Sequence, residues 1–132
     1  MIVVDASALA AFVLREEGWE ALGKHLVYAV SLDHVVKEVA NAIWRAACLR
    51  GFLSREEARR AYDLLRRMLG KNIMLEPELS YVEPALEISM SWGIPLYDAL
   101  YLALASEKSL PLLTLDARQR EVAVKLGLAV KP

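Results

Sequence analysis

The chain has 132 residues and only one cysteine, Cys48. A single thiol can form neither an intrachain disulfide nor a thiolate metal cluster, which is typical of proteins from a reducing cytoplasm. Long apolar runs are absent too: none approaches the ~20 residues that cross a bilayer. The acid at position 5 follows "MIVV" too soon for a signal peptide. We therefore expect a soluble, cytoplasmic protein.

Glycine is scarce, with six residues, and no glycine-rich turn follows "MIVV". This excludes a dinucleotide-binding domain, whose first strand leads into such a turn. The net charge of -1 argues against a broadly basic nucleic-acid-binding protein. Residues 45–71 nevertheless hold eight basic residues against three acids. This stretch fits either an ordinary solvated helix face with internal ion pairs or a local patch that contacts nucleic acid.

Short apolar runs alternate with helix-forming segments along the chain. Three runs are typical of strands buried between layers, namely "MIVV", "NIML" and "LPLLTL", and "LVYAV" and "LAV" are shorter candidates. Helices are expected at 7–18, from 31 or 33 to 50, at 54–69, 80–93 and 95–105, and at 117–127. The patterns "SREE" at 54–57 and "SYVE" at 80–83 indicate capping boxes at two of the starts.

Strands and helices that alternate without hairpin turns predict an α/β fold. We expect a three-layer α/β/α sandwich with a mainly parallel central sheet of about four or five strands. No repeat, linker or low-complexity tract interrupts residues 1–132, so the sequence predicts a single domain.

One charge stands in the otherwise apolar stretch "PLYDALYLALA" at residues 95–105. Its apolar side chains cover every face of a helix, so we expect the segment to be buried and Asp98 with it. An unpaired buried ion costs on the order of several kcal/mol, comparable with the stability of a small domain. Some partner must therefore stabilise this carboxylate.

Three further acids are expected at the same edge of the sheet. Asp5 and Asp116 follow strands, and Glu38 lies on the flank of its helix; ligands of parallel sheets gather where the strands end. Each acid also has an ordinary explanation, as a helix N-cap, a partner of a helix dipole or a surface residue. Clustered carboxylates persist mainly where a cation neutralises them, and hard oxygen ligands without Cys or a well-placed His select Mg²⁺ or Mn²⁺.

The segments "MIVVDASALAAF", "VVKEVANAIW", "PLYDALYLALA" and "LLTLDAR" resemble, in this order and spacing, the PIN-domain nucleases. The likeness extends from Ile2 to about Val130 and is greatest to the VapC-type toxins of prokaryotic toxin–antitoxin pairs. It implies a PIN-like fold and a metal-dependent endoribonuclease that hydrolyses single-stranded RNA with Mg²⁺ or Mn²⁺. The implied catalytic and metal-binding residues are Asp5, Glu38, Asp98 and Asp116, with Ser7, Asn41 and Thr114 beside them as orienting groups.

The resemblance also implies partners. A VapB-type antitoxin would lay a helical segment in an apolar groove, for which the exposed parts of Phe12, Trp19 and Trp44 are candidates alongside ordinary core roles. A homodimer is expected as well. Arginines from the basic stretch would follow the RNA backbone past the acids, and the candidates are Arg45, Arg50, Arg59 and Arg66.

Two other functions fit parts of the sequence. A haloacid-dehalogenase-like phosphatase also has an aspartate after its first strand, but it needs a second aspartate where this chain has Ser7. A non-catalytic PIN-like interaction module would be indicated by the loss of an acid, and none of the four is lost.

Overall fold

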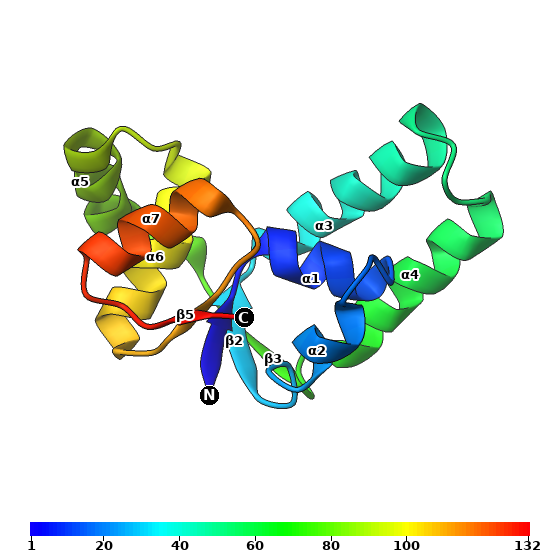
Figure 1. Ribbon diagram of the computed structural model, residues 1–132, viewed down its shortest axis with the longest axis horizontal. Coiled ribbons are helices and arrows are strands. Elements are labelled where there is room, and N and C mark those ends of the chain that lie inside the picture. The colour runs from blue at the N-terminus through cyan, green and yellow to red at the C-terminus, as the bar shows by residue number, and fades with distance from the viewer.

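A single five-stranded sheet forms the centre of the computed structural model, which describes all 132 residues (Figure 1). The strand order is β3-β2-β1-β4-β5, and every neighbouring pair is parallel. The predicted α/β sandwich is therefore confirmed, with a fully parallel sheet. The strands are β1 (Ile2–Val4), β2 (Ala29–Leu32), β3 (Ile73–Glu76), β4 (Leu112–Leu113) and β5 (Val130–Lys131).

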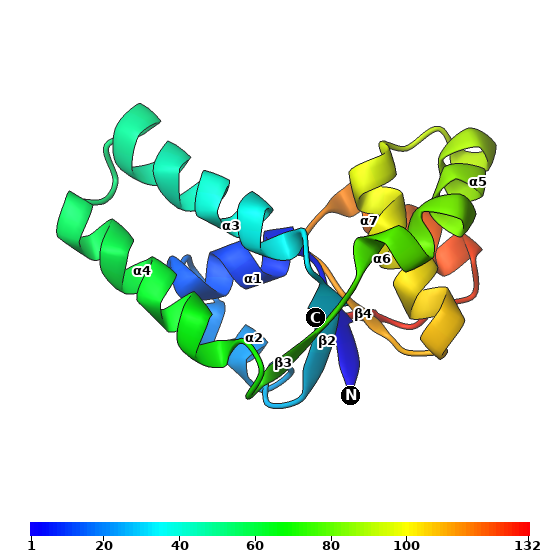
Figure 2. The ribbon, with the colours of Figure 1, turned by 180° about the vertical axis from the view of Figure 1, so that it is seen from behind.

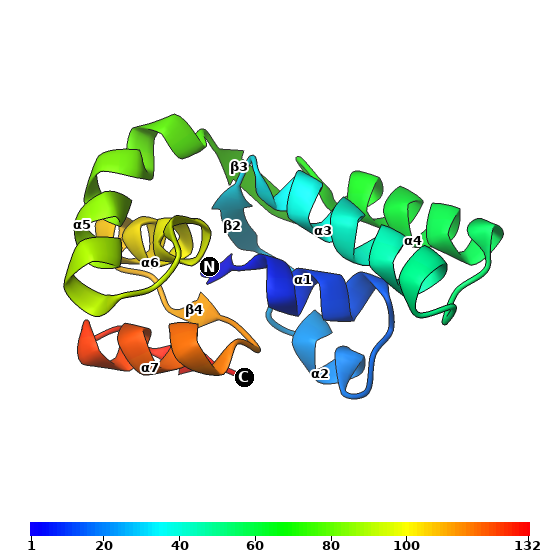
Figure 3. The same cartoon turned by 90° about the horizontal axis from the view of Figure 1, so that it is seen from above.

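Helices cover both faces of the sheet (Figure 3). One side carries α1 (Ala6–Val13), α2 (Trp19–Gly23), α3 (Val35–Trp44) and α4 (Arg55–Met68), and the other carries α5 (Val82–Trp92), α6 (Leu96–Lys108) and α7 (Ala117–Lys125). A π-helical segment, η1 (Arg45–Leu49), extends α3, and a 3-10 turn, η2 (Glu78–Tyr81), precedes α5. Seen from behind, α3 and α4 form a hairpin that projects away from the sheet (Figure 2).

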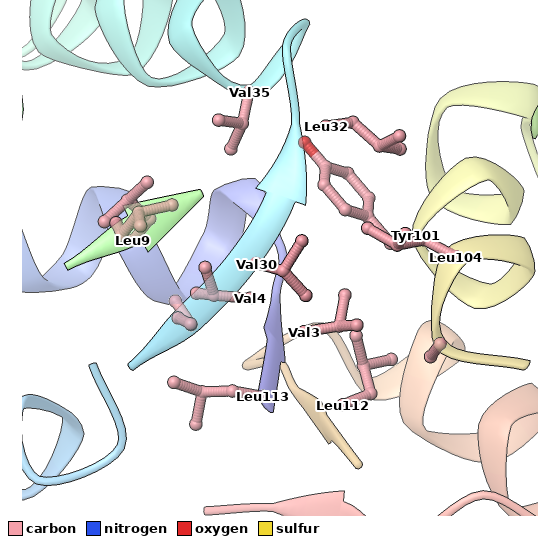
Figure 4. Close-up of a cluster of buried hydrophobic side chains, with 14 of the residues drawn as sticks. Val3, Val4, Leu9, Val30, Leu32, Val35, Tyr101, Leu104, Leu112 and Leu113 are labelled. Carbon is pink, nitrogen blue, oxygen red and sulfur yellow. The ribbon is translucent and has the colours of Figure 1, made fainter. Parts of the chain in front are cut away.

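The core lies on both faces of β1, whose side chains alternate between the two helical layers (Figure 4). Val3 is paired with Leu112 and points toward α6, while Val4 is paired with Leu113 and points toward α1. All four side chains are fully buried. Burial of each such side chain is worth about 1.5–3 kcal/mol, so the central strands fix the positions of the residues that follow them.

Three predicted boundaries are wrong. The first helix is predicted to reach residue 18, but α1 ends at Val13 and a separate helix, α2, begins at Trp19. Ser31 does not begin a helix but lies inside β2, where its buried hydroxyl donates to the Val4 carbonyl at 2.7 Å. The predicted capping box at Ser80 is not formed either, because Ser80 lies within η2 and its N–H bonds to the Pro77 carbonyl. The other capping box is confirmed: Ser54 accepts from the Glu57 N–H, and the Glu57 carboxylate accepts from the Ser54 N–H.

The helices are short or amphipathic, and none combines the length and the apolar character that a membrane crossing requires. Helix α6 comes nearest in character, because every residue from Ala99 to Ala105 is buried. Its partners are the sheet and the neighbouring α5 and α7. The prediction that this helix lies inside the protein is confirmed, although Asp98, in its first turn, is only partly buried.

Candidate metal centre at the carboxyl edge of the sheet

Asp5 lies at the centre of a hydrogen-bond network where β1 ends. Its side chain is completely buried and serves as the N-cap of α1, accepting from the Ala8 N–H at 3.0 Å. The Ser7 hydroxyl donates to Oδ1 at 2.7 Å, and the Thr114 hydroxyl donates to Oδ2 at 2.5 Å. Both hydroxyls are fixed in turn, because Ser7 Oγ accepts from the Leu115 N–H and Thr114 Oγ1 accepts from the Asp116 N–H.

Burial has a larger effect on Asp5 than these hydrogen bonds. Removal from water raises the pKa of Asp5 from 3.8 to about 6, although bonds from Thr114, Ala8 and Ser7 favour the ionised form. The nearby Asp116 carboxylate raises the pKa further. None of the groups that act on the pKa of Asp5 carries a positive charge.

A residue absent from the predicted site, Gln119, connects Asp5 to Asp98. Its amide nitrogen donates to Asp5 Oδ2 at 3.0 Å and to Asp98 Oδ1 at 3.2 Å. The two carboxylate oxygens are therefore no further apart than the sum of these distances, about 6 Å. Gln119 is 3% exposed, and its Oε1 atom has no hydrogen-bond partner.

Asp98 belongs to the same electrostatic unit. Burial raises its pKa, and so do the carboxylates of Asp116 and Glu38, whereas the Gln119 amide and the Arg118 guanidinium lower it. Arg118 lies in the first turn of α7 and donates to the Gly93 carbonyl just before α6. Asp98 is therefore close enough to both Asp116 and Glu38 for their charges to act on it.

Glu38 approaches from the other side, on α3. Its Oε1 atom accepts from the Tyr101 hydroxyl at 2.7 Å and lies 3.0 Å from His34 Nε2, without directed hydrogen-bond geometry to the imidazole. Tyr101 extends from α6 toward the end of β2 (Figure 4). Burial raises the pKa of Tyr101, as do the charges of Glu38, Asp5 and Asp98, so the phenol remains a proton donor. His34 is buried against Glu38, although no group of three His, Cys, Asp or Glu side chains that includes it is placed to hold a metal.

Asp116 caps the N-terminus of α7. As the N-cap of α7, its Oδ1 accepts from the N–H groups of Arg118 and Gln119 at 2.8 and 2.9 Å. This fixes the backbone of Gln119 at the start of the helix. The cap explanation therefore holds for both Asp5 and Asp116, and it does not exclude a second role, since each carboxylate has a second oxygen.

The predicted residues are not all brought together. Asp5, Asp98 and Asp116 lie at one edge with Ser7 and Thr114, and Glu38 faces them through Tyr101. Asn41 is exposed and bonds to none of them. No three acidic, His or Cys side chains are arranged as a ready metal site, so a cation would have to draw the carboxylates inward.

Sequence reasoning missed Gln119, Tyr101 and His34, and two of these have a local signal. Tyr101 follows Asp98 by three residues and so lies on the same helix face. Gln119 follows the N-cap Asp116 by three, the spacing of a capping box. In the structure its side chain does not return to the cap but bonds to Asp5 and Asp98 instead.

The four candidate RNA-binding arginines are exposed on the α3–α4 hairpin. Arg45 and Arg50 lie at the two ends of η1, and the Arg50 guanidinium stacks on Phe52 at 5.7 Å. Arg59 and Arg66 lie on α4. Their neighbours Arg60 and Arg67 are paired with Glu56 and Asp63 one helical turn away. Internal ion pairs are therefore present in the basic stretch, and contact with nucleic acid stays a prediction.

Known proteins share this fold. The model of the PIN domain family matches residues 2–125. The chain therefore belongs to the PIN domain family.

Within that family, the chain is similar to VapC proteins. It is 34% identical to Ribonuclease VapC3 of Pyrobaculum aerophilum, over 99% of this chain and 98% of the relative. It is 32% identical to Exonuclease VapC9 of the same organism, over 97% of this chain and 87% of the relative. The crystal structure of PAE2754 from Pyrobaculum aerophilum superimposes with a TM-score of 0.68, at 25% identity and 96% coverage of both chains.

Proposed function

We propose that this chain is a divalent-metal-dependent endoribonuclease that hydrolyses phosphodiester bonds of single-stranded RNA and acts as the toxin of a toxin–antitoxin pair. The observation that carries the proposal is the pair of carboxylates, Asp5 and Asp98, held within about 6 Å at the edge of a PIN fold. The named activity of the VapC3 and VapC9 relatives supports a nuclease.

The residues fit Mg²⁺ or Mn²⁺. Carboxylate oxygens are the ligands that these hard cations prefer, and the raised pKa of the buried Asp5 reflects a charge that nothing in the site neutralises. Asp5 and Asp98 would be the principal ligands, and Glu38 and Asp116 would add ligands directly or through water. Ser7 and Thr114 orient Asp5. The exposed Asn41 has the weakest support among the orienting residues.

A bound cation supplies charge neutralisation at the phosphate and an acidified water. The protein side chains contribute orientation and proton acceptance. The Tyr101 hydroxyl donates to Oε1 of Glu38, which leaves Oε2 to accept a proton from the attacking water. Asp116 holds the start of α7 against the site through its bonds to two backbone N–H groups.

The α3–α4 hairpin supplies the proposed RNA contacts. Arg45, Arg50, Arg59 and Arg66 are exposed and would attract the RNA phosphates, which the unloaded carboxylates repel. Phe52, which is 71% exposed beneath Arg50, offers a face for base stacking.

A groove between α1 and α4 is the proposed antitoxin site. Its volume is about 500 Å³, and Val13, Leu14, Leu53 and Leu64 give it an apolar floor. Phe12 and Trp19 stack edge to face nearby, whereas Trp44 is half exposed on α3. Homodimer formation would use the exposed apolar side chains of the α5 layer, which include Leu79, Leu86, Met90 and Tyr97.

The test uses a circular single-stranded RNA, because only an endonuclease opens a circle. With Mg²⁺ or Mn²⁺ the purified protein should linearise and then fragment it, EDTA should stop the reaction, and Asp98→Asn should lose activity by at least about 10²-fold. The control Asp63→Asn removes an acid paired with Arg67 on α4 and should remain active. Digestion of linear RNA alone would indicate the exonuclease mode of the VapC9 relative, and cleavage in EDTA would overturn the metal mechanism.

A further inference from the structure

Gln119 is the one buried amide side chain beside the carboxylates, and its two ends have opposite surroundings. Both hydrogens of Nε2 are used by Asp5 and Asp98, whereas Oε1 is buried without a partner. The orientation is dictated by the acids, because turning the amide would direct a carbonyl oxygen at two carboxylates.

The amide nitrogen occupies the lone pairs that a shared cation would need. A cation bridging Asp5 and Asp98 requires one oxygen from each at ~2.1 Å. Gln119 Nε2 now lies 3.0 and 3.2 Å from such an oxygen on each residue. Asp5 Oδ2 also accepts from the hydroxyls of Ser7 and Thr114, so no lone pair of this oxygen is left for a cation while the amide stays bonded. Asp98 Oδ1 accepts from the amide alone. Cation and amide therefore compete for Asp5 Oδ2.

We propose that Gln119 is an internal competitor of the metal: its amide bridges Asp5 and Asp98 when no cation is bound, and it must release Asp5 when one binds. The inference rests on the proposed metal site and adds a residue that sets how much cation is needed to load it. A partly positive N–H₂ group softens the repulsion between the acids without neutralising either charge. The unpaired Oε1 weakens the bridge, because burying an acceptor without a partner costs free energy in the conformation in which the amide bonds to both acids.

The first turn of α7 fixes the backbone position of Gln119. The Gln119 N–H is bonded to the Asp116 carboxylate at 2.9 Å, so the side chain starts from a fixed backbone position. Because Asp116 is itself a proposed ligand, movement of its carboxylate toward a cation would loosen the cap that holds Gln119. Binding of the cation by Asp116 and release of the Gln119 amide are thus coupled through the short segment between these two residues.

The first test measures Mn²⁺ affinity by calorimetry and by electron paramagnetic resonance, with thermal melts in EDTA. Gln119→Met keeps the length of the side chain and removes the competing donor, so it should bind Mn²⁺ about tenfold more tightly or better, since a charge-assisted bond is worth at least about the 1.4 kcal/mol of that factor. The same variant should melt below the wild type in EDTA. Gln119→Leu should behave alike and serves if the Met variant does not fold.

Asn72 provides the matched control. Its amide donates to the Val27 carbonyl, before β3 and away from the acids, so Asn72→Leu should lower the melting temperature and leave Mn²⁺ affinity unchanged. Unchanged or weaker Mn²⁺ binding in Gln119→Met would overturn the competitor role alone. A wild type that binds no Mn²⁺ at all would overturn the proposed function as well.

A second test needs no variant. The chain contains one glutamine and two asparagines, so its side-chain amides give only three NH₂ pairs in a nitrogen–proton spectrum. Mg²⁺ titration should shift the pair of Gln119, identified by glutamine-specific labelling, and leave that of Asn72 in place. A Gln119 pair that stays unmoved at saturating Mg²⁺ would contradict release of the bridge.

Discussion

At the scale of single residues, the charge of Asp5 is controlled by two opposing effects of similar size. Complete burial favours the protonated form, and donors from Ser7, Ala8 and Thr114 favour the ionised form. Burial prevails, and a carboxyl with a pKa of about 6 is the result. The hydroxyl of Thr114 makes the shortest of these bonds, so it is the donor on which ionisation depends most.

Thr114→Val should raise the pKa of Asp5 above about 6, by about one pH unit or more, because it removes a charge-assisted hydrogen bond worth about 1.5–3 kcal/mol and keeps the shape of the side chain. Carbon-13 titration of the Asp5 carboxyl in EDTA measures this. Ser31→Ala is the control, since that buried hydroxyl donates to the Val4 carbonyl and not to a carboxylate. If both substitutions raised the pKa of Asp5 equally, the change would reflect a general loosening of the structure and not the loss of the Thr114 hydrogen bond.

The positions of the acids could be predicted from the sequence because each is tied to a local pattern. Asp5 and Asp116 end apolar runs, and Asp98 interrupts an apolar helix. Gln119 could not be assigned in this way, because its bond to Asp5 joins residues 114 apart. His34 was missed for a similar reason, since its second neighbour, Glu78, lies beyond the next strand.

At the scale of elements, the two predicted capping boxes had opposite outcomes. Ser54 has the extended backbone of an N-cap, with ψ of 166°, and forms both bonds of the box. Ser80 has the same local spacing but lies in a 3-10 turn that follows Pro77. A nearby proline that starts a tighter turn thus overrides the spacing pattern, and this explains why α5 begins later than predicted.

Ser54→Ala should destabilise the protein by about 0.5–2 kcal/mol, because it leaves the Glu57 N–H without its acceptor at the start of α4. Ser80→Ala is the paired control and should stay within about 0.5 kcal/mol of the wild type. Urea unfolding of both variants measures the difference. A loss of stability at position 80 equal to that at position 54 would mean that Ser80 caps α5 in solution.

The sequence predicted that the strands exist, but it did not predict where each of them ends. The buried run of β1 is recognisable in "MIVV", but β2 includes Ser31, a polar residue that the local pattern assigns to a helix. Its hydroxyl is satisfied by the neighbouring strand, and this long-range bond has no signature in the adjacent sequence. The parallel pairing itself followed from the alternation of strands and helices.

At the scale of the whole molecule, the metal-free protein should lose stability as the solution becomes less acidic. Between pH 3.8 and about 6 the folded state retains a proton on Asp5 that the unfolded state has released. The free energy of unfolding therefore falls as pH rises through this window and stays low above it, by about 3 kcal/mol for this group. The raised pKa of Asp98 acts in the same direction.

Asp5→Asn removes this titration. The free energy of unfolding of the variant relative to the wild type should thus rise by about 2.4 kcal/mol between pH 4 and pH 7, whatever constant offset the lost hydrogen bonds add. Urea unfolding in EDTA at four pH values measures it. A difference that does not vary with pH would mean that Asp5 titrates alike in the folded and unfolded chains. Saturating Mn²⁺ should stabilise the wild type at neutral pH and the variant much less.

The strand order also determines when the site can exist during synthesis. β1 is central in the sheet but early in the chain, and its neighbour β4 is formed by residues 112–113. The hydroxyl and amide that hold Asp5 come from residues 109 and 114 positions later. A ribosome-bound chain that lacks them has no formed carboxylate centre, so this centre cannot be completed before residue 119 has emerged.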